Sequence, residues 1–164
     1  MENEETIICT SGYAQTINMF DIKVKKLNKL AKLPSRGRAA AAGYDLYAAT
    51  DKETSIPPHM TAMIGTGLAF ELLDGTFGAI FARSGLASKK GLRPANCVGV
   101  VDSDYRGEVK VALHNDSDHF MTIEAGERIA QMILMPYLPM NFVEVDELSE
   151  AARGTNGFGS TGNK

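Results

Sequence analysis

The sequence predicts an all-β domain, either a sandwich or a barrel. Short apolar segments rich in β-branched and aromatic residues recur at the intervals typical of these folds, and turn-forming residues separate them. The chain has 164 residues, which suits one domain with a core large enough to fold without disulfides. No internal repeat divides the sequence. Together these observations indicate a single β-rich unit.

The strands are expected to begin at residues 22–27, where apolar side chains alternate with lysines, as in a strand with one solvated face. Residues 39–49 contain many alanines, which favour helix, but Gly43 and the alternation of larger apolar residues with small ones indicate a closely packed strand. Further strands are expected at residues 60–64, 67–72, 77–81, 97–101, 109–113, 120–123, 129–135 and 142–145.

One short helix is expected at Ser84–Lys90, and Gly91 would end it. Residues 1–20 begin with an acidic run and are interpreted as an N-terminal extension, and residues 21–150 as the β-domain. Residues 151–164 are rich in glycine and too poor in apolar residues to fold alone. They are either a flexible flap that closes on an anion or a disordered tail, and their composition fits both.

Charge and cysteine content narrow the classes of function. The net charge of −3 gives no reason to expect direct nucleic-acid binding or attachment to an anionic membrane. No apolar run approaches the ~20 residues of a membrane-spanning helix. Cys9 and Cys97 lie far apart without metal-ligand spacing, and no signal peptide precedes them, so a cytoplasmic location is expected.

Residues 99–111 have the pattern of a β-hairpin, with valines on both sides of a polar turn that contains a glycine. A turn centred on residues 105–106 would place Val100 opposite Lys110 and Asp102 near the rim. A carboxylate fixed there, beside backbone donors and acceptors, is well placed to take a proton from water. An ordinary surface hairpin is the alternative, because tight turns use the same residue types.

Two other segments could hold an anion or a polar ligand. Arg83, Ser84 and Gly85 stand where a strand leads into the helix, an arrangement that can bind phosphate through backbone N–H groups. Ser84 could equally be a helix N-cap beside a solvated arginine. Gln131 lies within an apolar strand, so it is either a ligand contact or a core amide with its own partners.

These segments, taken in chain order, resemble the five sequence motifs of the homotrimeric dUTPase family. The motifs are Ala42–Leu46, Arg83–Gly85, Asn96–Gly107, Gly126–Leu134 and Arg153–Gly162. The resemblance covers the chain from residue 22 to its end and leaves the first twenty residues outside. One departure is Ala82, where many members of the family have proline, and this change should loosen the turn slightly.

The resemblance implies a jelly-roll-like β-barrel that assembles as a homotrimer. Its three active sites would lie at subunit boundaries, and the C-terminal flap of one subunit would close over a neighbour's site. The implied reaction is hydrolysis of dUTP to dUMP and pyrophosphate, with Mg²⁺ bound to the triphosphate. This reaction limits uracil incorporation into DNA and supplies dUMP for dTTP synthesis.

The resemblance also implies roles for individual residues. Asp102 would be the general base that activates the water attacking the α-phosphorus, and Tyr105 would pack beneath the deoxyribose. Asp45 would contact Mg²⁺ through water. The other residues expected to bind substrate are Arg83, Ser84, Gly85, Asn96, Val100, Val101, Lys110, Gln131, Arg153, Phe158, Gly159, Ser160 and Thr161.

Elementary chemistry gives these implied roles a rationale. Uracil differs from cytosine in its O4 acceptor and N3–H donor, and the backbone around Val100 and Lys110, with the Asn96 amide, could match that pattern. The Arg83–Gly85 motif would stabilise charge on phosphate oxygens. In residues 158–161 the phenylalanine would stack on the uracil, and the residues after it would surround the phosphates.

Two other functions remain open on the sequence alone. A dCTP deaminase or a bifunctional relative would share the fold, but such enzymes use a glutamate beside the hairpin as general base, and the sequence offers no convincing counterpart. A non-enzymatic trimer that binds a partner through residues 1–20 is the third hypothesis. The presence of all five motifs argues against it.

Overall fold

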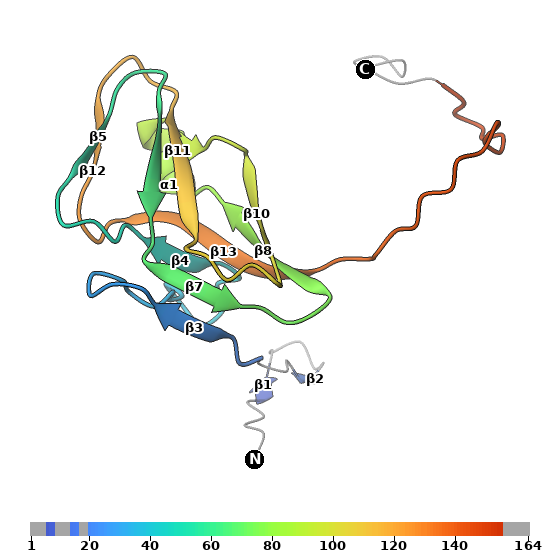
Figure 1. Ribbon diagram of the computed structural model, residues 1–164, viewed down its shortest axis with the longest axis horizontal. Helices are drawn as coiled ribbons and strands as arrows, with labels where there is room; N and C mark the ends of the chain where they lie inside the picture. Colours follow the sequence, from blue (N-terminus) through green and yellow to red (C-terminus); the bar gives the residue numbers. More distant parts are fainter. Residues whose placement is uncertain (1–5, 9–13, 17–19, 156–164) are drawn as a thin grey trace.

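The computed structural model describes residues 6–8, 14–16 and 20–155, and Figure 1 shows most of their strands wrapped around one interior. The strands are β1 (Thr6–Ile8), β2 (Ala14–Thr16), β3 (Lys23–Lys26), β4 (Tyr44–Tyr47), β5 (Thr54–Ile56), β6 (Thr61–Gly65), β7 (Leu68–Glu71), β8 (Thr76–Phe81), β9 (Leu92–Pro94), β10 (Val98–Asp102), β11 (Lys110–Asn115), β12 (Met121–Ile123) and β13 (Arg128–Pro136). The helix is α1 (Ser84–Lys90).

Two sheets supply most of the domain. Four strands form the larger sheet in the order β10-β8-β13-β4, and three form the second in the order β6-β11-β9. The pairs β12-β5 and β3-β7 extend the walls, and every pairing is antiparallel. One hydrophobic cluster lies between these sheets, and its fully buried members include Leu46, Ile64, Leu113 and Ile129. The arrangement is a jelly-roll-like β-domain, so the all-β prediction is confirmed.

The strands predicted between residues 22 and 135 are all present, although their ends differ by a few residues. The sequence did not indicate β5 and β9, because each has only three residues and one of them contains proline. The predicted strand at residues 142–145 is wrong. Those residues form no strand in the described part of the chain, and Phe142 is 85% exposed.

The predicted pairing of the hairpin is also wrong. Val100 pairs with Ala79 of β8, and Lys110 pairs with Gly65 of β6, so β10 and β11 belong to different sheets. Both strands bury one face in the shared core, and residues 103–109 pass from one sheet to the other. A polar turn between two valine-rich strands has the same local sequence whether the chain reverses within a sheet or crosses between two.

The helix prediction is confirmed at Ser84–Lys90, with Gly91 at φ 65° and its N–H bonded to the Leu86 carbonyl. Ser84 is not the N-cap, because the cap position is Arg83 and no side chain caps the helix there. With seven residues, α1 is also far too short to cross a bilayer, and no other helix occurs in the described residues.

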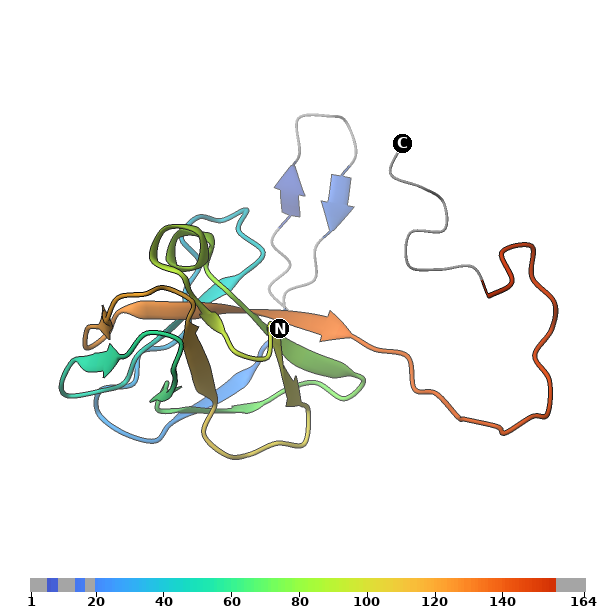
Figure 2. The ribbon, with the colours of Figure 1, turned by 90° about the horizontal axis from the view of Figure 1, so that it is seen from above.

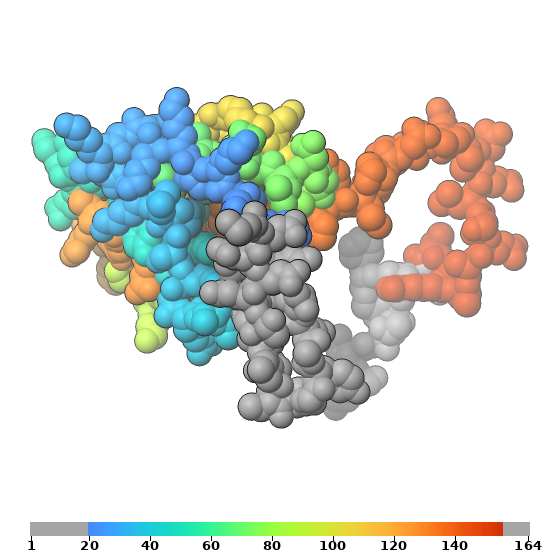
Figure 3. All heavy atoms as spheres, turned by 90° about the horizontal axis from the view of Figure 1, so that it is seen from below, coloured from blue at the N-terminus to red at the C-terminus, as the bar shows by residue number. Residues whose placement is uncertain are grey.

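Residues 137–155 leave the domain after β13 and form what we call the C-terminal arm. Figures 1 and 2 show this arm running away from the β-domain, and the space-filling view in Figure 3 shows the same separation. Leu138, Phe142 and Leu148 are each more than four-fifths exposed. Exposed apolar side chains in such a row are typical of a segment that packs against another molecule.

Asn115, at the end of β11, ties together the loops at one end of the domain. It is fully buried, and its Nδ2 donates to the carbonyls of Ile56, Pro57 and His119 at 3.0, 3.1 and 2.7 Å. Its Oδ1 accepts from the Ser117 N–H at 3.0 Å and from the Ser117 hydroxyl at 2.7 Å. A single amide therefore satisfies polar groups that would otherwise lie buried without partners.

We expect Asn115→Ala to lower the free energy of unfolding by about 2–4 kcal/mol, because several buried polar groups lose their partner together. Urea unfolding at fixed protein concentration measures the loss. Asp118→Ala in the same loop is the control, since its pair with His59 is exposed and its removal should cost no more than about 1 kcal/mol. Equal losses for the two variants would contradict the role given to Asn115.

Candidate functional site

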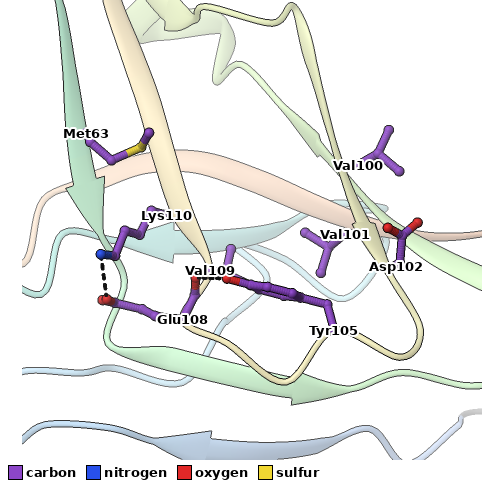
Figure 4. A pocket seen from close by; sticks show the side chains of 8 residues that line it. All are labelled: Met63, Val100, Val101, Asp102, Tyr105, Glu108, Val109 and Lys110. Atoms are coloured by element: carbon purple, nitrogen blue, oxygen red, sulfur yellow. Dashed lines mark hydrogen bonds and ion pairs between the residues drawn. The ribbon is translucent and has the colours of Figure 1, made fainter.

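The first of two clefts opens where β10 and β11 diverge. It has a volume of about 430 Å³, and Figure 4 shows the side chains around it. Its lining residues are Met63, Val100, Val101, Asp102, Tyr105, Glu108, Val109 and Lys110. The sequence predicts Val100, Val101, Asp102, Tyr105 and Lys110 for one site, and the structure brings these five together.

Strand β10 presents Asp102 toward solvent. Burial alternates along this strand, so Val101 faces the core while Val100 and Asp102 share the exposed face. The strand is at the edge of its sheet, and its outer edge has no partner strand within the described residues. Unpaired backbone N–H and C=O groups at such an edge can bind the edge of a planar ligand.

Tyr105 is fixed in the turn that follows β10. Its hydroxyl donates to the Glu108 carbonyl oxygen at 3.1 Å, and its ring lies against Gly107, where any Cβ would collide with the hydroxyl. The backbone N–H of Tyr105 also bonds to the Asp102 carbonyl at 3.2 Å. The aromatic ring is thus held beside Asp102 as one wall of the cleft.

Glu108 and Met63 also line this cleft, although the sequence analysis did not predict them as site residues. Glu108 accepts a hydrogen bond from the Gly67 N–H at 2.9 Å, and its other oxygen lies 3.5 Å from Lys110 Nζ. Glu108 lies beside the turn, so it is the residue to weigh against the deaminase alternative. Because a backbone donor and a cation already occupy its oxygens, it is poorly disposed to act as a general base.

The second cleft lies between β4, β13 and the start of α1, with a volume of about 350 Å³. Its lining residues are Gly37, Arg38, Ala41, Gly43, Asp45, Arg83, Ser84, Gly85, Arg128 and Gln131. Three arginines and one carboxylate give it a net positive charge, so it suits an anionic group. Arg38 and Arg128 are not among the residues that the sequence predicts for the site.

Asp45 organises the arginines of the second cleft. Arg83 Nε donates to one carboxylate oxygen at 2.8 Å, and Arg128 Nη1 donates to the other at 3.1 Å. The Asp45 side chain is only 13% exposed. Charge-assisted bonds at this degree of burial orient both guanidinium groups, so Asp45 holds them in place for a ligand.

Ser84 and Gln131 reach the same cleft from different elements. Ser84 is the first residue of α1, and its hydroxyl bonds to none of the described residues. Gln131 Nε2 donates to the Ala82 carbonyl at 2.9 Å, while its oxygen lies against Gly43, where a Cβ would collide with it. Half of the Gln131 amide is therefore satisfied within the fold, and its oxygen lies at the cleft wall.

The remaining predicted residues lie apart from both clefts or outside the described residues. Asn96 is exposed in the turn before β10 and lines neither cleft. Arg153 lies on the C-terminal arm. Phe158, Gly159, Ser160 and Thr161 lie outside the described residues. The two clefts share no lining residue, so they are separate within one chain.

The donor chemistry of the second cleft bears on Mg²⁺. Among the described residues, no group of three or more His, Cys, Asp or Glu side chains could hold a metal ion. Asp45 is the one carboxylate among the described residues that line this cleft, and arginines already bond to both of its oxygens. These residues fit a Mg²⁺ ion bound chiefly by ligand phosphates and water, because magnesium commonly keeps several waters.

The fold and the clefts define a small β-domain suited to an anionic ligand. Comparisons with known proteins identify the family to which this domain belongs. The sequence matches the dUTPase family over residues 29–162. The deoxyuridine 5′-triphosphate nucleotidohydrolase of Desulfitobacterium hafniense is 49% identical over 149 residues, which cover 88% of this chain and 99% of the relative. That of Saccharomyces cerevisiae is 46% identical over 143 residues, covering 87% and 95%.

A solved structure agrees with these relatives. The structure of the dUTPase of Staphylococcus bacteriophage 80alpha with dUPNHPP superposes with a TM-score of 0.80 at 30% identity, and the match covers 88% of this chain and 99% of that one. The chain belongs to the dUTPase family.

We expect Asp45→Asn to lower the free energy of unfolding by about 1.5–3 kcal/mol, because two charge-assisted hydrogen bonds lose their anion. Asp116→Asn is the matched control. Its carboxylate pairs with Arg93 at 2.7 and 2.9 Å but is exposed, so the loss should stay below about 1 kcal/mol. Urea unfolding at one ionic strength compares them, and a smaller loss for Asp45 than for Asp116 would refute the assignment.

Proposed function

We propose that this protein hydrolyses dUTP to dUMP and pyrophosphate. The observation that carries the proposal is the difference in chemistry between the two clefts. One has an aromatic wall, an exposed carboxylate and a strand edge without a partner strand among the described residues, and the other has three arginines. A nucleoside and a phosphate chain have the matching chemistry. Membership of the dUTPase family supports the same substrate.

The first cleft would bind the nucleoside. Main-chain groups of Val100, Val101 and Lys110 read the uracil edge, and Asn96 joins them once substrate is bound. Tyr105 packs beneath the deoxyribose, where its fixed ring leaves no space for a 2′-hydroxyl.

The second cleft would bind the triphosphate. Arg83, Ser84, Gly85 and Gln131 donate to its oxygens, with Arg83 oriented by Asp45. Mg²⁺ bound to the triphosphate neutralises phosphate charge when present, and Asp45 would meet it only through water.

Asp102 would act as the general base. Its carboxylate takes a proton from a water molecule as the water oxygen bonds to the α-phosphorus. The bond from the α-phosphorus to the bridging oxygen breaks, and pyrophosphate leaves with that electron pair. The exposed position of Asp102 at the end of a paired strand suits this task, because the strand fixes the side chain while solvent reaches it.

The complete site would form between subunits of a homotrimer. The separation of the two clefts within one chain supports this arrangement, as does the exposed apolar surface of the C-terminal arm. The arm would bring Arg153 and residues 158–161 of one subunit over a neighbour's site. There the arginine would bind phosphate, and Phe158 would stack on the uracil.

In the cell, this activity would limit uracil incorporation into DNA and supply dUMP for dTTP synthesis. The exposed, unpaired Cys97 is consistent with a reducing cytoplasm, where we place the protein. Assays of pyrophosphate release from dUTP and of ammonia release from dCTP test the proposal directly. Turnover of dCTP alone would replace it with a deaminase.

We expect Asp102→Asn to lower kcat for dUTP by about 10²-fold or more with little change in dUTP binding, because the positioned base is lost. Steady-state kinetics and isothermal titration with a non-hydrolysable analogue separate the two effects. Asp104→Asn, an exposed carboxylate in the same turn, is the control and should stay near wild type. A normal kcat for Asp102→Asn would remove the base from the mechanism.

Mixing two damaged chains tests the shared site. Asp102→Asn damages the first cleft and Arg83→Ala the second, so each homotrimer should be nearly inactive. If a site uses one cleft from each of two subunits, co-refolded mixtures should regain activity at about a quarter of their sites. Native mass spectrometry confirms that mixed trimers form. Mixed trimers without regained activity would mean that each chain holds a complete site.

A further inference from the structure

Glu108 is anchored on both sides of its carboxylate, just before β11. One oxygen accepts the Gly67 N–H at 2.9 Å, and the other lies 3.5 Å from Lys110 Nζ. Its main-chain carbonyl receives the Tyr105 hydroxyl at 3.1 Å. Figure 4 shows Glu108 between Lys110 and Tyr105 on the wall of the first cleft. One residue thus links two of the side chains that shape the cleft.

The connection from β6 to β7, residues 65–67, is built around this carboxylate. A Cβ at Gly65 would lie 2.5 Å from Glu108 Oε1, so a glycine is needed to leave the carboxylate its place. Gly67 has φ +65°, a conformation that turns the chain where its N–H meets Glu108. Buried Thr66 then bonds to the Val109 carbonyl through its N–H at 3.2 Å and its hydroxyl at 2.7 Å.

An ordinary surface turn has no need of such an anchor. A glutamate in a solvated turn would keep its rotamer freedom, whereas the Glu108 side chain is 27% exposed and held at both oxygens. The anchor fixes residues 107–109, and these carry the carbonyl that holds the Tyr105 hydroxyl. If the anchor is released, the turn can shift and the tyrosine ring can withdraw from the cleft.

We propose that Glu108 is a positioning residue that sets the preference of the first cleft for a deoxyribonucleotide over a ribonucleotide. It acts through Tyr105 and Lys110 and does not itself touch the sugar. The proposal rests on the proposed function. It adds that the Gly65–Gly67 turn, by holding Glu108, contributes to the preference for a deoxyribonucleotide.

The test is the ratio of kcat/KM for dUTP to that for UTP. Glu108→Ala should lower this ratio about tenfold, the scale of one lost hydrogen bond to a charged group. Glu108→Gln should keep most of the ratio, because its amide oxygen can still accept the Gly67 N–H. A merely structural role would reduce turnover of both substrates together and leave the ratio unchanged.

A second substitution, at Gly65, tests the role of the same carboxylate. Gly65→Ala should displace Glu108 without removing it and should lower the ratio in the same direction. In the double variant with Glu108→Ala, the Gly65 change should have no further effect on the ratio, because the atom it collides with is gone. Independent, multiplying effects would overturn the proposal. If Glu108→Ala folds poorly, Gly65→Ala alone still tests the proposal, because it displaces Glu108 without removing it.

Glu71→Ala is the matched control. This carboxylate lies on β7 and pairs with Lys23 at 2.7 Å, and the hydrogen bond and charge of Lys23 hold the pKa of the Glu71 carboxyl below its usual range. It lines neither cleft, so its loss should leave the ratio unchanged. If wild-type protein fails to hydrolyse dUTP, the proposed function falls. If it does so and Glu108→Ala keeps the wild-type ratio, only the role of Glu108 falls.

Discussion

Two sheets bury their faces in a single hydrophobic core, and this constraint decides where the polar groups of the chain can lie. Strands β10 and β11 follow each other in sequence, yet each belongs to a different sheet. The chain between them therefore crosses a corner of the domain and does not close a hairpin. The cleft at that corner exists because the strands part there, and Asp102 and Tyr105 lie on its wall.

The second cleft depends on a different balance. Three arginines close together would repel one another, and Asp45 offsets that repulsion while fixing two of them. One carboxylate against three guanidinium groups leaves this cleft with a net positive charge. The Glu108 anchor has a related design, since a carboxylate is held by a backbone N–H and a cation. In both clefts, acidic side chains position other groups, whereas Asp102 stays exposed to solvent.

Much of this could be predicted from the sequence, because strand period and motif order are local properties. The alternation of apolar residues predicted the strands between residues 22 and 135 except β5 and β9. The motifs singled out Asp102, Tyr105, Arg83 and Gln131, and the structure places them at two clefts. Strand partners could not be predicted in the same way. Strand pairing depends on contacts between segments far apart in the sequence. The valines flanking residues 103–109 are compatible both with a hairpin and with a crossing between two sheets.

The residues that sequence analysis missed are those whose role depends on distant partners. Glu108 in a polar turn resembles a solvated residue until the Gly65–Gly67 turn is placed beside it. Arg128 contacts Asp45 only because β13 pairs with β4, so its role could not be predicted from the local sequence. The glycines at 65 and 67 were the available signal, since two glycines around one threonine indicate that another group approaches the backbone closely.

The exposed C-terminal arm also affects how vulnerable a newly synthesised chain is to aggregation and proteolysis. Leu138, Phe142 and Leu148 are not covered by any other part of the chain that the structure describes. A chain that has not yet joined the proposed homotrimer therefore exposes an apolar, protease-accessible segment as soon as its β-domain is folded. In the proposed homotrimer, the rate of assembly would set how long this segment stays exposed, so the amount of protein in the cell would depend on its rate of synthesis as well as on its stability.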